Sequence, residues 1–187
     1  MFNKKSMTLV ELIIAMLLVS TFLLAGVSVE LAMRRINRTT DLEAILITEG
    51  ETILLRISSD LQNSLGALHP SLPLESPFRT ALVPQYQVRK DANHDSMPDF
   101  FDTWSGYHFH APLHELRYFP DAANATYVVL SDHVMSFSMA RLQNGTAYPC
   151  VKIDLSLVDD PLQPFPTITN PQVDFTTCVA PHAASIS

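Results

Sequence analysis

The sequence predicts an α+β protein in which one long N-terminal helix packs on an antiparallel β-sheet. Three observations lead to this prediction. An uncharged apolar run lies near the N-terminus, apolar residues at helical spacing continue beyond it, and short β-rich runs separated by prolines fill the rest of the chain. With 187 residues, the chain is long enough for one domain with a modest core.

The apolar run is long enough to cross a bilayer. From Leu12 to Val29 no residue is charged, which gives about 18 residues, or about 27 Å of helix. Counting from Met7 gives about 23 residues and adds one charge, that of Glu11. A cleaved secretory signal has a shorter apolar core. We therefore expect a transmembrane helix over residues 7–29.

The helical pattern continues without a break as an amphipathic segment over residues 30–68. Its apolar residues are spaced mostly by three or four, which places them on one face of a helix. They are Ile36, Leu42, Ile45, Leu46, Ile53, Ile57, Leu61 and Leu65. Gly66 and Pro70 follow, and these two residue types commonly end a helix.

Residues 69–187 form the predicted β-rich domain. Most of the 13 prolines lie beyond Leu68, which excludes another long helix. Apolar and polar residues alternate from Val151 to Leu157, as in a half-buried strand. Asn144-Gly145 has the composition of a tight turn, so we expect a hairpin joining Val134–Leu142 to Ala147–Leu157. Further strands are expected at Tyr86–Val88, Glu115–Phe119, Thr126–Leu130 and Val173–Val179.

Composition and motifs argue against two classes of function. The net charge is −7, and the one basic cluster consists of Arg34, Arg35 and Arg38, so a nucleic-acid partner is not expected. The sequence has no Gly-x-Ser-x-Gly motif and no glycine-rich phosphate loop. His108, His110 and His114 lack the spacing of a tetrahedral metal site. We therefore predict that the chain is not an enzyme.

The N-terminal residues carry a family resemblance. The segment Lys-Lys-Ser-Met-Thr-Leu-Val-Glu-Leu-Ile over residues 4–13 resembles the class III signal of type IV pilins and type II secretion pseudopilins. The resemblance implies a leader at residues 1–6, which a prepilin peptidase removes by cutting between Ser6 and Met7, followed by methylation of Met7. The family usually has glycine before the cut, where this chain has Ser6. It also implies that Glu11 meets the N-terminal amine of a neighbouring subunit.

A second stretch of sequence resembles one subgroup of this family. Residues 54–61, Leu-Leu-Arg-Ile-Ser-Ser-Asp-Leu, are similar to a pattern in J-type minor pseudopilins and related minor pilins. This implies a pilin-like fold and a structural subunit that assembles with other pilins or pseudopilins and primes a type II secretion pseudopilus or a type IV pilus. Its partners would then be those subunits, the prepilin peptidase and the inner membrane.

Charge alone leaves the orientation of the span undecided. Lys4 and Lys5 precede it, but Arg34, Arg35 and Arg38 follow it, and the positive-inside rule counts both groups. The family resemblance implies a cytoplasmic N-terminus and a periplasmic C-terminal domain, held in a bacterial inner membrane by one span.

An acidic segment at residues 91–102 has the spacing of a calcium loop. Oxygen-bearing side chains stand at its positions 1, 3, 5, 9 and 12, and the carbonyl of position 7 adds a ligand. These residues are Asp91, Asn93, Asp95, Asp99 and Asp102, with Met97 supplying the carbonyl. The segment resembles the calcium loops of thrombospondin type 3 repeats. Ser96 stands where a calcium loop has the glycine of its sharp turn. A solvated acidic loop without calcium is the other interpretation.

The two cysteines, Cys150 and Cys178, lie in the half that the resemblance places in the periplasm, where a disulfide can form. Two free thiols are the alternative. For the whole chain, the alternative to a minor pilin-like subunit is a pilin-anchored, calcium-dependent adhesin or binding module.

Overall fold

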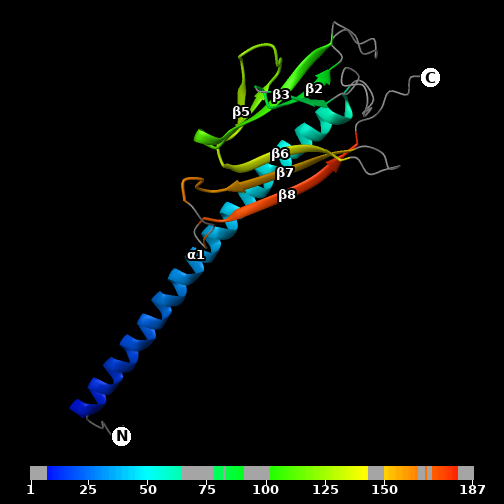
Figure 1. Cartoon of the computed structure of the whole chain (residues 1–187). Coiled ribbons are helices and arrows are strands. Elements are labelled where there is room, and N and C mark those ends of the chain that lie inside the picture. The colour runs from blue at the N-terminus through cyan, green and yellow to red at the C-terminus, as the bar shows by residue number, and fades with distance from the viewer. Residues whose placement is uncertain are drawn as a thin grey trace. The chain divides into compact units, whose positions relative to one another are not determined.

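The computed structural model describes residues 8–64, 78–81, 83–90, 102–142, 150–163, 167 and 170–180. They form an α+β arrangement of one long helix, α1 (Leu9–Gln62), and two antiparallel sheets (Figure 1). The chain divides into two units, one ending at Asp41 and one beginning at Leu42, and each is described by itself.

The first unit contains the apolar part of α1, and its large side chains are exposed. Leu9, Phe22 and Met33 are among them, with 75%, 76% and 62% of their surface accessible. Apolar side chains on every face of a helix are typical of a segment covered by lipid or by other subunits. Among the described residues, α1 is the helix that is long and apolar enough to cross a membrane, which agrees with the predicted span.

The second unit begins with the part of α1 that packs against the sheets. Its buried residues follow spacings of three and four, as an amphipathic helix requires. They are Leu46, Gly50, Ile53, Ile57 and Leu61.

The helix ends at Gln62, a turn before the predicted stop at Gly66. Ser64 lies directly after it and is buried; its hydroxyl donates a hydrogen bond of 2.6 Å to the carbonyl of Leu61. A serine that satisfies one of the last carbonyls in this way ends the helix without glycine. Residues 65–77, including Gly66 and Pro70, lie outside the described part.

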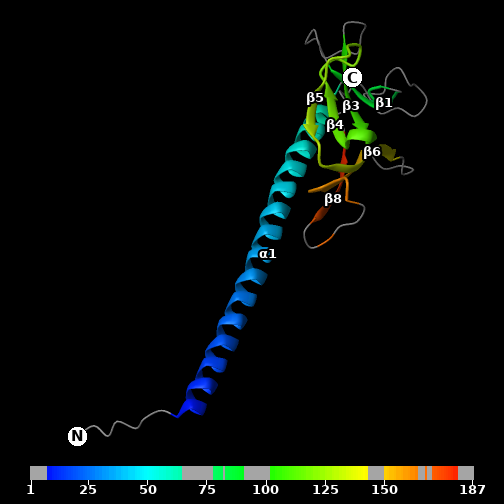
Figure 2. The same cartoon turned by 90° about the vertical axis from the view of Figure 1, so that its left-hand side faces the viewer.

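Sheet A has five antiparallel strands in the order β1-β2-β3-β4-β5. Their bounds are β1 Phe78–Thr80, β2 Tyr86–Lys90, β3 Thr103–His110, β4 Glu115–Phe119 and β5 Val128–Ser131. A short 3-10 turn, η1 (Ala111–Leu113), joins β3 to β4, and His114 completes it with a positive φ of 54°. Figure 2 shows sheet A from the side on which β5 and β4 lie beside α1.

Sheet B has three antiparallel strands in the order β6-β7-β8, with bounds Val134–Leu142, Cys150–Val158 and Gln172–Val179. In β7, Val151, Ile153, Leu155 and Leu157 are buried, which confirms the alternation seen in the sequence. The predicted pairing of this strand with β6 is also confirmed, with Phe137 opposite Leu155. The expected turn at Asn144-Gly145 lies outside the described residues.

One core joins α1 to both sheets. Ile57 and Leu61 of the helix, Val88 of β2 and Ile153 of β7 are all fully buried within it. Tyr86 of β2 meets Phe137 of β6 edge to face, with ring centroids 5.5 Å apart. Because apolar residues of both sheets contribute, the core holds the two sheets and the second half of α1 as one unit.

Two features of the β-rich region differ from the prediction. The structure has two sheets where one was expected, and it contains β1 and β3, which the sequence patterns did not indicate. On one face of β3, Trp104, His108 and His110 are only partly exposed, while Tyr107 on the other face is buried. The partly exposed face carries these ring-bearing residues instead of clearly polar ones. The sequence of β3 therefore lacks the plain apolar–polar alternation that indicates a half-buried strand.

Candidate functional site

Thr8 and Glu11 close the start of α1 with reciprocal hydrogen bonds. The backbone N–H and the hydroxyl of Thr8 donate to Oε2 of Glu11 at 2.8 and 3.0 Å. The backbone N–H of Glu11 in turn donates to the Thr8 hydroxyl at 3.3 Å. This is a capping box, the arrangement of Thr followed three residues later by Glu that satisfies the free N–H groups of a helix start. This capping box was not predicted, although the Thr-x-x-Glu spacing is visible in the sequence.

The two residues of the expected processing site, Ser6 and Met7, lie outside the described part of the chain. The structure therefore places Glu11 one turn into α1 and leaves the cleavage position undescribed. Both bonds from Thr8 end on Oε2, and Oε1 of Glu11 accepts no hydrogen bond from another described residue.

A polar cluster fixes the end of α1 to sheet A. The hydroxyl of Tyr107 donates to Oδ2 of Asp60 at 2.6 Å. Lys90 lies 3.0 Å from Oδ1 of the same carboxylate and donates to the Tyr118 hydroxyl at 2.9 Å. Arg56 stacks on the Tyr118 ring, 4.0 Å from its centroid. Arg56 and Asp60 stand one helical turn apart, and each contacts a different residue of sheet A.

The ionisation of this cluster follows from its burial. Burial is the first cause that raises the pKa of Tyr107, followed by the neighbouring Asp60 charge, so Tyr107 stays a hydrogen-bond donor. Burial alone would lower the pKa of Lys90, but the Tyr118 hydroxyl and the Asp60 carboxylate outweigh it and raise that pKa. Lys90 is therefore charged at neutral pH, and the cluster holds an ion pair that joins helix and sheet.

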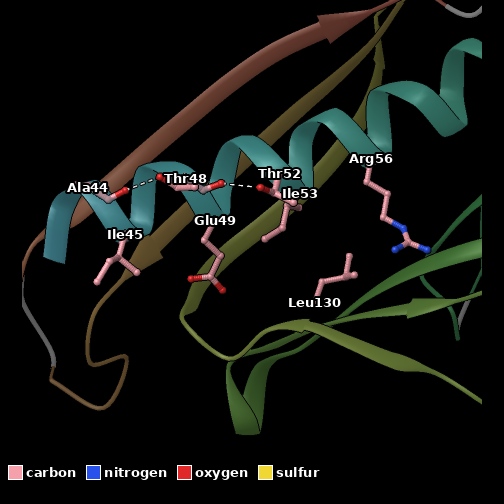
Figure 3. Close-up of a pocket in the computed structure, with 8 residues that line it drawn as sticks. All are labelled: Ala44, Ile45, Thr48, Glu49, Thr52, Ile53, Arg56 and Leu130. Carbon is pink, nitrogen blue, oxygen red and sulfur yellow. Dashed lines mark hydrogen bonds between the residues drawn. The ribbon is translucent and has the colours of Figure 1, made fainter. Parts of the chain in front are cut away.

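An open groove of about 620 Å³ runs between α1 and the edge strand β5 of sheet A (Figure 3). It is lined by Ala44, Ile45, Thr48, Glu49, Thr52, Ile53, Arg56 and Leu130. Glu49 also contacts His133, whose Nδ1 lies 3.1 Å from the carboxylate. No histidine, serine or cysteine is among the described residues that line this groove.

Of the proposed calcium ligands, Asp102 lies in the described part of the chain, and it binds an arginine. Oδ2 of Asp102 accepts a hydrogen bond of 2.9 Å from Arg89, and the two side chains are only 1% and 10% exposed. In this buried pair, the positive charge of Arg89 already compensates the negative charge of the Asp102 carboxylate. The other five residues of the set, Asp91, Asn93, Asp95, Met97 and Asp99, lie outside the described residues, so calcium binding stays a prediction.

No group of three or more His, Cys, Asp or Glu side chains in the described ranges is arranged to hold a metal ion. His108 and His110 lie on the same face of β3, with ring centroids 6.4 Å apart. Burial, then His110 and Arg117, lower the pKa of His108. His114 is turned elsewhere, with its Nδ1 3.2 Å from the carbonyl of Val134.

The two cysteines lie on neighbouring strands, Cys150 at the start of β7 and Cys178 near the end of β8. They are free thiols in the structure. Burial first, and then a hydrogen bond with the Cys178 thiol, raise the pKa of Cys150. The strands are those on which a bridge was expected, and the bridge itself stays a prediction.

No protein-family model, no curated protein and no solved structure matches the chain.

Proposed function

We propose that the chain is a minor pilin-like structural subunit, anchored in a bacterial inner membrane, that assembles into and primes a type II secretion pseudopilus or a type IV pilus. It carries out no chemical reaction in this role. Its N-terminus lies in the cytoplasm and its β-rich domain in the periplasm. The partners are other pilin or pseudopilin subunits, together with the prepilin peptidase that removes residues 1–6.

The observation that carries the proposal is the difference in exposure between the two parts of α1. One continuous helix of 54 residues has a first part with exposed apolar side chains and a second part whose apolar stripe is buried under two sheets. Such a helix suits a subunit whose domain has its own core and whose exposed apolar segment is covered by lipid or by other subunits. The resemblance of residues 4–13 to the prepilin signal supports the same role.

Glu11 is the residue we assign to assembly. A carboxylate within an apolar segment is costly, by about 2.5–3.5 kcal/mol on insertion scales for charged residues, and a cationic partner offsets this cost. Cleavage before Met7 would create such a cation, an N-terminal amine four residues before Glu11. Pairing the amine of one subunit with the Glu11 of its neighbour would set the stagger between them.

Processing tests the class. Co-expression with a prepilin peptidase should remove Met1–Ser6 and leave a chain that begins at Met7 and carries one added methyl group. Intact-mass analysis of the purified chain measures both changes. A chain that stays uncut, or is cut after Ala25, contradicts the proposal.

Variants of the capping box test the assembly role. Glu11→Gln keeps a side chain that can cap the helix but removes the charge, whereas Thr8→Ala weakens the cap and keeps the charge. We expect Glu11→Gln to insert into membranes at least as well as the parent and to lose co-assembly with its partner subunits. If Thr8→Ala reduces co-assembly as much as Glu11→Gln does, the cap and not the charge is what assembly needs, and the pairing role is wrong.

A further inference from the structure

Three arginines form an exposed basic face on α1, just after its apolar run. Arg34, Arg35 and Arg38 lie within an arc of about 100° around the helix axis, given 3.6 residues per turn. Arg34 pairs with Glu30 at 2.5 Å, with both side chains mostly exposed. Arg35 and Arg38 are exposed and make no ion pair with any described residue. Two guanidinium groups on this face therefore have no partner within the described chain.

If the hydrocarbon core ends at Val29, this face begins at the outer edge of the headgroup layer of a bilayer and continues beyond it. The uncharged run ends at Val29, so Arg34 lies about 7.5 Å and Arg38 about 13.5 Å further along the axis, at 1.5 Å per residue. The headgroup region extends about 5–8 Å beyond the hydrocarbon core on each side. Arginine side chains are long enough to reach back toward that layer from a position just above it.

The positive charge of these three arginines at this position also needs an explanation. With a cytoplasmic N-terminus, three arginines would follow the span on its outer side against Lys4 and Lys5 on its inner side, and the positive-inside rule opposes that distribution. A chain of net charge −7 has no general excess of cations to place there. Guanidinium groups bind phosphate with two parallel hydrogen bonds, which a lysine cannot do.

We propose that Arg34, Arg35 and Arg38 bind the phosphate groups of anionic phospholipids at the membrane surface from which the folded domain emerges. This inference rests on the membrane anchoring in the proposed function. Arg35 and Arg38 supply the free guanidinium groups, and Glu30 limits the contribution of Arg34 by occupying it. The contact would fix the depth of the helix in the bilayer before assembly.

The test uses the full chain, reconstituted in vesicles of phosphatidylcholine and phosphatidylglycerol in equal parts. After extraction in mild detergent, native mass spectrometry measures which lipid stays bound. We expect phosphatidylglycerol to be enriched. Each basic residue near an anionic surface contributes about 1 kcal/mol, so Arg35→Gln/Arg38→Gln should lower the enrichment by up to about fivefold for each arginine removed. Glu30→Gln should raise it, because Arg34 is released.

A control removes one positive charge from sheet B, at Lys152, whose side chain is partly exposed and pairs with Asp154. Lys152→Gln should leave the lipid preference unchanged, whereas Arg38→Gln should lower it. No enrichment in the parent chain, or equal enrichment in the parent and Arg35→Gln/Arg38→Gln, overturns the proposal. So does an arginine variant that keeps its lipids but loses co-purification with a second subunit, since the face would then contact protein.

A separate measurement distinguishes this failure from failure of the anchoring. The parent chain should float with vesicles of phosphatidylcholine alone and stay bound in high salt, because an apolar span needs no headgroup charge. If it does not, membrane anchoring is wrong and this inference falls with it. If the chain inserts but shows no lipid preference, the arginine contact alone is wrong.

Discussion

The contact between Asp60 and Tyr107 should contribute strongly to the stability of the folded domain. Tyr107 is fully buried, and its hydroxyl has Asp60 as acceptor at 2.6 Å. Asp60→Ala leaves that buried hydroxyl without this acceptor, which costs about 1–3 kcal/mol. It also removes the ion pair with Lys90, whose side chain is 32% exposed, so that this loss is only about 0.2–1 kcal/mol. The expected destabilisation is about 1–4 kcal/mol.

A double-mutant cycle isolates the contact. Tyr107→Phe removes the hydroxyl together with its bond to a charged group, at a cost of about 1.5–3 kcal/mol. Once Asp60 is alanine, however, removing the orphaned hydroxyl should cost little or even stabilise the fold. The cycle of Asp60→Ala and Tyr107→Phe should therefore show a coupling energy of about 1.5–3 kcal/mol.

Denaturant unfolding of the chain in detergent measures these values, with the fluorescence of Trp104, the single tryptophan, as the probe. Asp41→Ala is the matched control: it is the same substitution on the same helix, at an exposed carboxylate with no described hydrogen bond or ion pair, and it should change stability by less than about 0.5 kcal/mol. If the two effects of the cycle simply add, Tyr107 and Asp60 do not interact, and the account of how α1 is fixed to sheet A is wrong.

Three further predictions concern packing, redox state and the acidic loop. A Cβ at Gly50 would lie 2.2 Å from the ring of Phe175, so Gly50→Ala should destabilise the domain in thermal unfolding, although alanine favours a helix by about 1 kcal/mol; a stabilised variant would contradict this. Oxidation of the folded chain should join Cys150 and Cys178 and raise the melting temperature; a Cα separation above about 7 Å in an experimental structure excludes the bridge. Millimolar calcium should raise the melting temperature over a chelator control, and Asp95→Ala should abolish the rise; equal melting temperatures mean that the loop is only solvated.

The division of the helix into an exposed apolar part and a part with a buried stripe was predictable, because two simple sequence patterns indicate it. An uncharged run predicts the exposed half of α1, and spacings of three and four predict the buried stripe from Leu46 to Leu61. The strands from β4 to β8 were also predictable where apolar residues alternate, as at Val151–Leu157. In each case a local pattern and the tertiary environment require the same residues.

The parts that escaped prediction depend on contacts between distant segments. Asp60 could be paired with Arg56 by spacing, but its observed partners, Tyr107 and Lys90, come from two strands whose pairing the sequence does not reveal. The same holds for Asp102, which has the spacing of a calcium ligand but lies against Arg89. Local spacing identifies residues able to make a contact, and the sheet topology decides which contact they make.

The geometry of Glu11 explains how one carboxylate could cap its own helix and also serve a neighbour. Thr8 engages only Oε2, through its backbone N–H and its hydroxyl. An incoming N-terminal amine could therefore bind Oε1 without breaking the cap, and the subunit would keep the stability of a capped helix start, about 1 kcal/mol. Assembly would then add an ion pair while the cap stays in place. Because capping uses the oxygen and pairing uses the charge, Glu11→Gln separates the two roles, whereas Glu11→Ala would remove both.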